Sequence, residues 1–459
     1  MGLGQTADFL AGVIEGFYGP PWTPSQRVEL FEWMRAWGLN TYLYAPKDDL
    51  KHRAIWRQIY AAAEAEKLRE TIQVAKRRTV RFIYALSPGL DIDYESQTDQ
   101  AHLKNRFEQM IALGCRDFAL LFDDVPERVE AKSEGSLATA QARLANSLFR
   151  WTREQSPSAI FLFCPAAYCG RMAERKLGGE DYLGTLGREL LPEIDVFWTG
   201  PEIISREITV AHIEQLRAVL HRKPVIWDNL HANDYDGRRL YCGPCSGRPP
   251  ELRTAVKGLL SNPNNEFPLN FVPIRTLAKF VHCEGAWDSR GAFLEALAEW
   301  LPHFATVGPP IRFEDLRLFA DCYYLPHEEG PEAQALYELA KSLVTTREMI
   351  SRTEAETFRA TARRLRDFCV RMTELRDRSL FYALSRRIWD LREELDLLLG
   401  FIDWKAQRTD PNERCHSDFH LPGTFRGGMV ARLQSLLAQQ EDGSIGPTDV
   451  GAHSLAARR

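Results

Sequence analysis

The segment that decides the fold is residues 23–45, which read TPSQRVELFEWMRAWGLNTYLYA and contain a complete helix followed at once by a strand. Thr23 can cap the helix, with proline at the first helical position and glutamine at the third, where its side chain can complete a capping box. Apolar residues at helical spacing then run from Leu30 to Trp37, and Gly38 suits the left-handed residue that ends a helix. The next strand begins directly at Leu39, so this segment predicts a helix packed on a buried strand.

Eight short apolar runs, rich in β-branched and aromatic residues, recur along the N-terminal part of the chain. Their spacing of about 30 to 40 residues is the length of a βαβ unit. Continuous rather than alternating hydrophobicity is typical of strands that are covered on both faces. The runs are Phe9–Glu15, Leu39–Ala45, Val80–Leu86, Asp117–Phe122, Ala159–Cys164, Ile194–Trp198, Pro224–Trp227 and a weaker Gly258–Ser261. Eight such units predict an α/β fold, a (β/α)8 TIM barrel.

From Phe293 onward the strand pattern fades and long amphipathic helices replace it. We expect helices at about 332–352, 354–378 and 380–406 that form a bundle, then an ordered loop over 407–428 and a short helix. The third helix carries a heptad-like apolar stripe, which core packing explains better than a ligand role. The stripe consists of Leu384, Ile388, Leu391, Leu395, Leu398 and Ile402. The predicted domains are a barrel at 1–290, an all-α helical bundle at 291–440 and a disordered tail at 441–459.

The composition is that of an ordinary globular protein: 459 residues, 44% hydrophobic and 26% charged, with a formal net charge of -5. This balance excludes a disordered chain and offers no electrostatic case for nucleic acid. No stretch approaches the roughly 20 apolar residues that a membrane span needs, and the N-terminus lacks the pattern of a signal peptide. We therefore expect a cytoplasmic protein without nucleic-acid or membrane partners.

The nine cysteines are odd in number and lie mostly in apolar strands, which suits reduced thiols in a cytoplasm. Cys242 and Cys245 form a single C-G-P-C motif, which has the sequence pattern of a thioredoxin-type redox pair. The motif lies in a loop rich in glycine and proline, and no second pair completes a zinc site. We interpret these two residues as spare loop thiols.

Polar residues follow the predicted strands at the point where each strand ends. These positions are Glu15–Gly19, Pro46–Asp49, Ser87–Asp91, Asp123–Asp124, Tyr168–Gly170, Trp198–Pro201, Trp227–Tyr235 and Asn262–Asn264. Each one alone has a structural explanation as a helix cap or a turn. Together they meet at the C-terminal face of the barrel, where barrel enzymes carry their chemistry. Carboxylates, amides, aromatic rings and one lysine, without an HExxH motif or a phosphate-binding loop, indicate a neutral polyhydroxylated ligand and neither metal nor cofactor.

The adjacent pair Asp123 and Asp124 suggests acid–base chemistry on that ligand. The usual retaining glycosidase needs two carboxyl groups about 5.5 Å apart across the bond, one of them a nucleophile. Neighbouring residues that leave one strand are poorly placed for this, because their side chains start toward opposite faces. In the substrate-assisted exception the acetamido group of the substrate is the nucleophile. One carboxylate then orients the amide while the other protonates the leaving oxygen.

Four long motifs in this order resemble the O-GlcNAcase family, glycoside hydrolases that remove β-linked N-acetylglucosamine from Ser and Thr of proteins. The motifs are GVIEGFYG at 12–19, NTYLYAPKDD at 40–49, LLFDD at 120–124 and WDNLHANDY at 227–235. The pattern is closer to the nucleocytoplasmic animal enzyme than to secreted bacterial members. The resemblance continues into the helical part, through Tyr323–His327 and His420–Gly423.

The resemblance implies a role for each matching residue. Asp123 would hold and polarise the acetamide, and Asp124 would be the general acid and then the base that activates water against an oxazoline intermediate. Tyr168 and Asn229 would support the acetamido group, and Trp227 would wall the pocket of its methyl group. The residues that would bind the sugar hydroxyls are Gly16, through its backbone, Lys47, Asp234 and Asn262.

The resemblance also implies partners: an O-GlcNAc-modified protein or glycopeptide as substrate, and a second copy of the chain in a homodimer formed by the helical region, which would also line the substrate groove. Two alternatives stay open. The protein could be a hexosaminidase that acts on free oligosaccharides containing N-acetylglucosamine. It could instead be a non-catalytic glycan-binding barrel, since a fold does not by itself determine a function.

Overall fold

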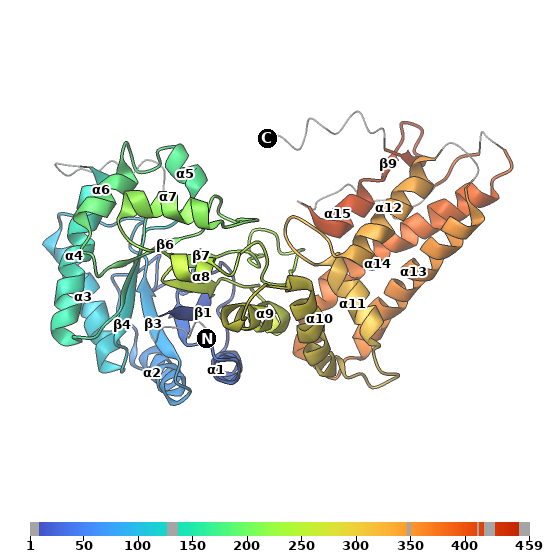
Figure 1. Ribbon diagram of the computed structural model, residues 1–459. Helices are drawn as coiled ribbons and strands as arrows, with labels where there is room; N and C mark the ends of the chain where they lie inside the picture. The colour runs from blue at the N-terminus through green and yellow to red at the C-terminus, as the bar shows by residue number, and fades with distance from the viewer. Residues whose placement is uncertain (1–8, 126–135, 347–349, 411–412, 417–426, 449–459) are drawn as a thin grey trace. The chain divides into compact units, whose positions relative to one another are not determined.

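The computed structural model describes residues 9–125, 136–346, 350–410, 413–416 and 427–448. The chain divides into two compact units, one formed by 1–234 with 245–292 and the other by 235–244 with 293–459. The first unit contains the parallel sheet and the second is built mainly from helices (Figure 1).

The first unit is a closed barrel of eight parallel strands, in which each strand pairs with the next and β8 closes on β1. The strands are β1 (Leu10–Glu15), β2 (Thr41–Tyr44), β3 (Arg81–Leu86), β4 (Asp117–Leu121), β5 (Phe161–Cys164), β6 (Asp195–Trp198), β7 (Val225–Asp228) and β8 (Gly258–Ser261). All eight coincide with the predicted runs to within two residues at each end. The predicted (β/α)8 barrel is therefore confirmed.

Helices lie between the strands along the chain and pack outside the barrel, as α2, α3 and α4 do in Figure 1. The helices of this unit are α1 (Pro24–Trp37), α2 (Ala62–Arg77), α3 (Gln97–Ala112), α4 (Leu137–Gln155), α5 (Gly170–Glu174), α6 (Tyr182–Glu189), α7 (Val210–Leu220), α8 (Leu252–Ala255), the 3₁₀ turn η1 (Phe267–Asn270) and α9 (Phe271–His282).

The signals read from residues 23–45 act as predicted in α1. The Thr23 side chain accepts from the backbone N–H of Gln26, and the Gln26 side chain accepts from the N–H of Thr23, at 3.3 and 2.9 Å. Gly38 ends the helix with a φ of +75°, a conformation that costs glycine little. Capping at both ends thus supplies partners for some of the backbone groups that the ends of a helix leave unpaired.

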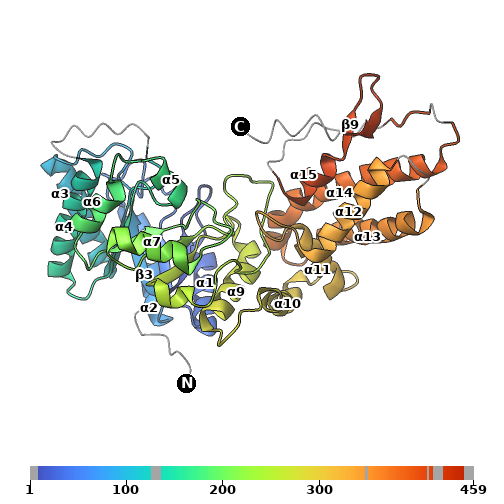
Figure 2. The ribbon, with the colours of Figure 1, turned by 45° about the horizontal axis from the view of Figure 1, so that its top comes forward.

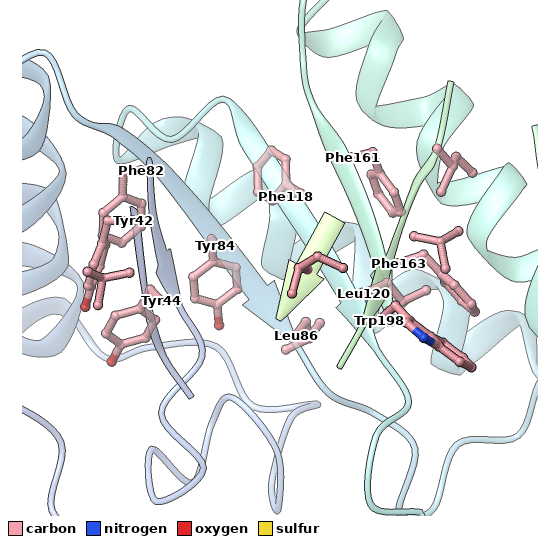
Figure 3. Close-up of a cluster of buried hydrophobic side chains, with 14 of the residues drawn as sticks. Tyr42, Tyr44, Phe82, Tyr84, Leu86, Phe118, Leu120, Phe161, Phe163 and Trp198 are labelled. Carbon is pink, nitrogen blue, oxygen red and sulfur yellow. The ribbon is translucent and has the colours of Figure 1, made fainter. Parts of the chain in front are cut away.

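Strand residues alternate between two apolar layers. In β2 and β3, Tyr42, Tyr44, Phe82 and Tyr84 belong to the cluster that includes the surrounding helices, whereas Ile83 belongs to a cluster made chiefly of strand residues, the interior of the barrel. Figure 3 shows the aromatic side chains of the outer cluster along β2 to β6. Both faces of the strands are thus buried, which explains why the strands read as continuous apolar runs.

The second unit contains a helical bundle in which α12, α13 and α14 pack on one another (Figure 2). Its elements are α11 (Phe313–Cys322), α12 (Pro331–Thr345), α13 (Arg352–Arg371), α14 (Arg378–Gln407), α15 (Gly428–Gln434), β9 (Leu437–Gln439), β10 (Ile445–Pro447) and the 3₁₀ turns η2 (Leu301–Phe304) and η3 (Met372–Glu374). The helix α10 (Ser289–Trp300) carries the chain from the first unit into the second. All six residues of the predicted apolar stripe on α14 are buried, as core packing requires.

Two features of this unit differ from the sequence analysis. Residues 235–244, expected within the barrel domain at 1–290, group with the helical unit. The backbone N–H groups of Cys242 and Gly243 donate to the carbonyls of Tyr323 and Tyr324, each at 2.7 Å. The start of the predicted disordered tail is also wrong, because residues 441–444 form a turn that leads into β10, and β10 pairs antiparallel with β9. Residues 449–459 and the His420–Gly423 loop lie outside the described residues.

All nine cysteines lie in the described part of the chain, and none forms a disulfide. Cys242 and Cys245 are both buried, and burial raises the pKa of the Cys242 thiol to about 12. These two thiols are therefore protonated at neutral pH, which agrees with spare thiols and not with a reactive redox pair. Among the described residues, no helix combines the length and the apolar character that crossing a membrane requires.

Candidate active site

The predicted site residues of the first unit lie at the carboxyl ends of the barrel strands. Asp123 and Asp124 follow β4 after a single residue, Phe122, and the backbone of Asp124 has a φ of +53°. This left-handed conformation is uncommon outside glycine, although aspartate tolerates it better than most residues. It breaks the strand alternation that would turn adjacent side chains to opposite faces. The two carboxylates can therefore both serve one site.

Asp123 is held by a buried ion pair with Lys47, which follows β2. The Lys47 Nζ donates to Oδ2 of Asp123, and the two side chains are only 2% and 9% exposed. The other oxygen of Asp123, Oδ1, is buried and has no hydrogen-bond partner among the described residues. A buried carboxylate oxygen without a donor costs free energy unless a ligand supplies one. Oδ1 of Asp123 is thus an acceptor ready for an N–H or O–H group.

Asp124 accepts hydrogen bonds from two tyrosines instead. The hydroxyl of Tyr168, after β5, donates to Oδ1 at 2.8 Å, and that of Tyr18, after β1, donates to Oδ2 at 3.0 Å. Burial, together with the nearby charge of Asp124, raises the pKa of both tyrosines far above their ordinary value. Both hydroxyls therefore remain neutral donors, and they orient the Asp124 carboxylate from two sides.

A second cluster joins the ends of β1, β7 and β8. Asn229 Oδ1 accepts from Trp227 Nε1 and from Asn262 Nδ2, both at 3.0 Å. Asn262 Oδ1 in turn accepts from the backbone N–H of Gly16 at 3.3 Å. A side chain on Gly16 would place its Cβ 2.5 Å from Cζ2 of the Trp227 ring, so glycine is required for this approach. The Lys47 ammonium lies 5.7 Å from the centre of the Trp227 ring, which connects this cluster to the Asp123 pair.

Asp234 completes the predicted set. Its Oδ2 accepts from the backbone N–H of Tyr18 at 2.9 Å. Burial raises the pKa of Asp234, the charge of Asp124 raises it further, and the hydrogen bond from Tyr18 and the charge of Lys47 act in the opposite direction. The structure thus links all nine predicted residues through direct contacts or mutual electrostatic effects, and it brings them to the ends of the strands.

Some strand-end carboxylates have structural roles. Glu15, at the end of β1, is fully buried and forms a bidentate pair with Arg27 of α1 at 2.9 and 2.7 Å. Asp228, at the end of β7, forms a bidentate pair with the buried Arg248 at 2.8 and 2.7 Å. Such pairs anchor the strands and leave these carboxylates without free acceptors for a ligand.

Two residues in contact with the acidic pair were not predicted. Tyr18 lies within the GVIEGFYG motif, but no role was inferred for it. Arg53, in the connection between β2 and α2, donates to the backbone carbonyl of Asp124 at 2.8 Å. The position of Tyr18 among the residues that follow the end of β1 was a signal that it could belong to the site. Nothing in the spacing of the sequence indicates the contact of Arg53, which joins residues 71 positions apart.

Chemically, the site offers one carboxylate fixed by an ammonium group, a second fixed by two hydroxyls, and a rim of amides and an indole ring. Such a set can bind an uncharged sugar and supply a proton to a leaving oxygen. No group of three or more His, Cys, Asp or Glu residues suited to a metal ion is found within the described ranges. A (β/α)8 barrel with paired carboxylates and a rim of this kind at the C-terminal face is typical of glycoside hydrolases.

Comparisons with known proteins agree with this class. The family model described as beta-N-acetylglucosaminidase matches residues 11–317. The chain therefore belongs to the β-N-acetylglucosaminidase family, as the resemblance to O-GlcNAcases implied.

The chain is similar to the Protein O-GlcNAcase of Rattus norvegicus and to that of Mus musculus, each 48% identical over 278 residues, which are 60% of this chain and 30% of the relative. The matched region thus spans less than a third of these relatives. Among solved structures, a mutant of the O-GlcNAc hydrolase of Thermobaculum terrenum matches with a TM-score of 0.68 and 28% identity, covering 86% of this chain and 83% of the other.

Proposed function

We propose that the chain removes β-linked N-acetylglucosamine from Ser and Thr residues of proteins, with retention of configuration and with the acetamido group of the substrate as nucleophile. The observation that carries this proposal is the contrast between Asp123 and Asp124. The two carboxylates are adjacent in sequence, yet one is paired with an ammonium group and the other with two hydroxyls. Different environments suit two carboxylates to different roles.

Asp123 would bind the acetamide. Its free Oδ1 accepts the acetamide N–H, while the ion pair with Lys47 holds the carboxylate in place. Accepting this N–H increases the electron density on the acetamide oxygen and opposes the positive charge that develops as the oxygen attacks the anomeric carbon. As this bond forms, the bond from the anomeric carbon to the leaving oxygen breaks, and the product is an N-protonated oxazoline whose N–H stays hydrogen-bonded to Asp123.

Asp124 would transfer the protons. As an acid it protonates the leaving Ser or Thr oxygen while the glycosidic bond breaks. As a base it then takes a proton from water, whose oxygen attacks the anomeric carbon and opens the oxazoline. Two displacements at one carbon return the β configuration, so the product is β-N-acetylglucosamine.

The remaining residues would position the sugar. Tyr168 and Asn229 would support the acetamido group and Trp227 would cover its methyl group. The residues that would bind hydroxyls are Gly16, Lys47, Asp234 and Asn262. The connected amides of Asn229 and Asn262 support this assignment, because a fixed network holds donors and acceptors in place before the sugar arrives.

We further propose that the protein works in the cytoplasm as a homodimer, with the barrel unit, 1–234 with 245–292, as the catalytic part and with the helical unit forming the dimer. Nine unpaired cysteines support a reducing compartment. The names of the rodent relatives support a glycoprotein substrate.

The test compares three substrates of the purified protein: an aryl β-N-acetylglucosaminide, a peptide carrying O-linked N-acetylglucosamine on serine, and chitobiose. The proposal expects turnover of the first two and much slower turnover of chitobiose. Faster cleavage of chitobiose than of the glycopeptide would favour a hexosaminidase of free oligosaccharides. Binding of the sugar without turnover of any substrate would favour a non-catalytic glycan-binding barrel.

A further inference from the structure

Arg53 contacts the backbone of both acidic residues that follow β4. Its side chain is buried, with the whole residue only 7% exposed. Nη2 donates to the carbonyl oxygen of Asp124 at 2.8 Å, and Nη1 points to the carbonyl oxygen of Asp123 at a longer 3.5 Å. The planar guanidinium thus spans two successive carbonyl groups with its two terminal nitrogen atoms, in a fixed fork that an ammonium group lacks.

These carbonyls belong to the turn that directs the Asp124 side chain. With a φ of +53°, Asp124 has a backbone conformation that persists only where the surroundings enforce it. Tyr18 and Tyr168 restrain the carboxylate, whereas Arg53 restrains the backbone that carries it. The same guanidinium carbon lies 5.8 Å from the centre of the Tyr18 ring, within the range of a cation–π contact. Arg53 therefore supports Asp124 both directly and through a tyrosine that donates to its carboxylate.

We propose that Arg53 is a positioning residue for the general acid and base: it holds the turn at Asp123 and Asp124, and thereby places the Asp124 carboxyl within reach of the leaving oxygen. This inference rests on the proposed function. The hydrogen bonds of Arg53 to this turn go to backbone carbonyl groups. Its removal should therefore impair proton transfer more than it impairs sugar binding.

The experiment measures kcat and KM of the unmodified chain and of Arg53→Met on two aryl β-N-acetylglucosaminides. One substrate has a dinitrophenyl leaving group and the other has a methoxyphenyl leaving group. The dinitrophenolate leaves without a proton, whereas methoxyphenol needs one. The expected result is a loss of kcat on the order of 100-fold for the methoxyphenyl glycoside, as for a misplaced catalytic group. The loss for the dinitrophenyl glycoside should stay below about threefold, and KM should change little for both.

The matched control is Arg57→Met in the same connection. Arg57 forms ion pairs with Asp91 and Asp99, at 2.6 and 2.7 Å, and its side chain is 32% exposed. This variant should leave the ratio of the two rates unchanged. For the methoxyphenyl glycoside, kcat of Arg53→Lys should lie between that of the unmodified chain and that of Arg53→Met. If Arg53→Met does not fold, the same comparison is made with Arg53→Lys.

Each outcome separates the two proposals. An equal loss for both glycosides in the Arg53 variants, or no loss, would overturn the positioning role while leaving the proposed function intact. If the unmodified chain hydrolyses neither glycoside, the proposed function fails, and the positioning role fails with it.

Discussion

The ammonium group of Lys47 and the carboxylate of Asp123 form a buried ion pair that joins the end of β2 to the end of β4. Only one oxygen of Asp123 takes part, and the second faces no donor among the residues that the structure describes. Forming a buried pair does not always stabilise a protein, but removing one partner leaves an uncompensated charge. The pair therefore contributes both to the stability of the barrel and to the fixed position of the Asp123 carboxylate in the site.

The first prediction concerns this pair. Lys47→Met should lower the free energy of unfolding by about 3 kcal/mol, because the Asp123 charge loses its buried partner. It should also lower kcat/KM, since the carboxylate is no longer fixed. Urea denaturation and steady-state kinetics measure the two effects.

Lys51→Met is the control for Lys47. The ion pair of Lys51 with Glu64 lies nearer the surface, with side chains that are 16% and 49% exposed. Its loss should change the free energy of unfolding by less than about 1 kcal/mol. Equal losses in the free energy of unfolding for the two substitutions would contradict the claim that the buried pair of Lys47 matters more for stability than the exposed pair of Lys51.

The second prediction separates the two carboxylates. Asp124→Ala should lower kcat by about 10²- to 10⁴-fold for substrates with poor leaving groups and spare those with activated ones, because the lost group supplies a proton. Asp123→Ala should damage the hydrolysis of both kinds, since the attack of the acetamide accompanies the departure of every leaving group. Rates on a series of aryl glycosides distinguish the variants. The same leaving-group dependence in both would show that the roles are not divided as proposed.

The third prediction concerns the close approach of Gly16 to Trp227. In Gly16→Ala the new Cβ would lie 2.5 Å from the indole ring, so the ring must move. Overpacking of this kind costs on the order of 1–3 kcal/mol. Because Trp227 is proposed to wall the methyl pocket, inhibition by free N-acetylglucosamine should weaken about tenfold or more.

Gly237→Ala provides the comparison for Gly16, because a Cβ at position 237 has no atom within 4 Å. Inhibition by the sugar should be the same in this variant as in the unmodified chain. Unchanged inhibition in Gly16→Ala as well would mean that Trp227 does not border the sugar.

The fourth prediction is a pH dependence of stability that arises from His52. Burial, assisted by the charge of Lys47, lowers the pKa of His52 from 6.5 to about 3. Between these values the unfolded chain binds a proton that the folded chain does not bind, so this contribution to stability is fully present above pH 6.5 and is lost as the pH falls toward 3. The slope from this group is about 1.4 kcal/mol per pH unit. In His52→Gln, urea denaturation at a series of pH values should give a slope smaller by up to this amount, and an identical slope would contradict the assignment.

The parts of the fold that the sequence predicts are those that residues close together in the chain specify. Thr23 and Gly38 act through residues beside them in the chain, so the ends of α1 could be predicted from sequence alone. The turn between β9 and β10 carries a comparable signal, Asp442 followed by Gly443 with a φ of +80°, and it was overlooked within a polar tail. The grouping of 235–244 with the helical unit depends on contacts far along the chain, which no local pattern reports.

The same distinction applies to the site. Its predicted members follow strand ends, and closure of the barrel brings the carboxyl ends of all strands to one face. The position of these residues in the sequence was therefore sufficient to predict that they lie at one site. The left-handed backbone of Asp124 and the contact of Arg53 with it depend on how two loops pack. Arginine in a polar loop is usually solvated, and only the structure distinguishes Arg53 from Arg57.

The central claim is that the acetamido group of the substrate is the nucleophile, and stepwise fluorination of that group tests it most directly. Fluorine withdraws electrons from the acetamide oxygen and weakens its attack on the anomeric carbon. The account predicts that kcat/KM for a single aryl glycoside falls steeply from acetyl through monofluoroacetyl and difluoroacetyl to trifluoroacetyl. A rate that does not depend on the number of fluorine atoms would contradict the participation of the acetamide and with it the proposed mechanism.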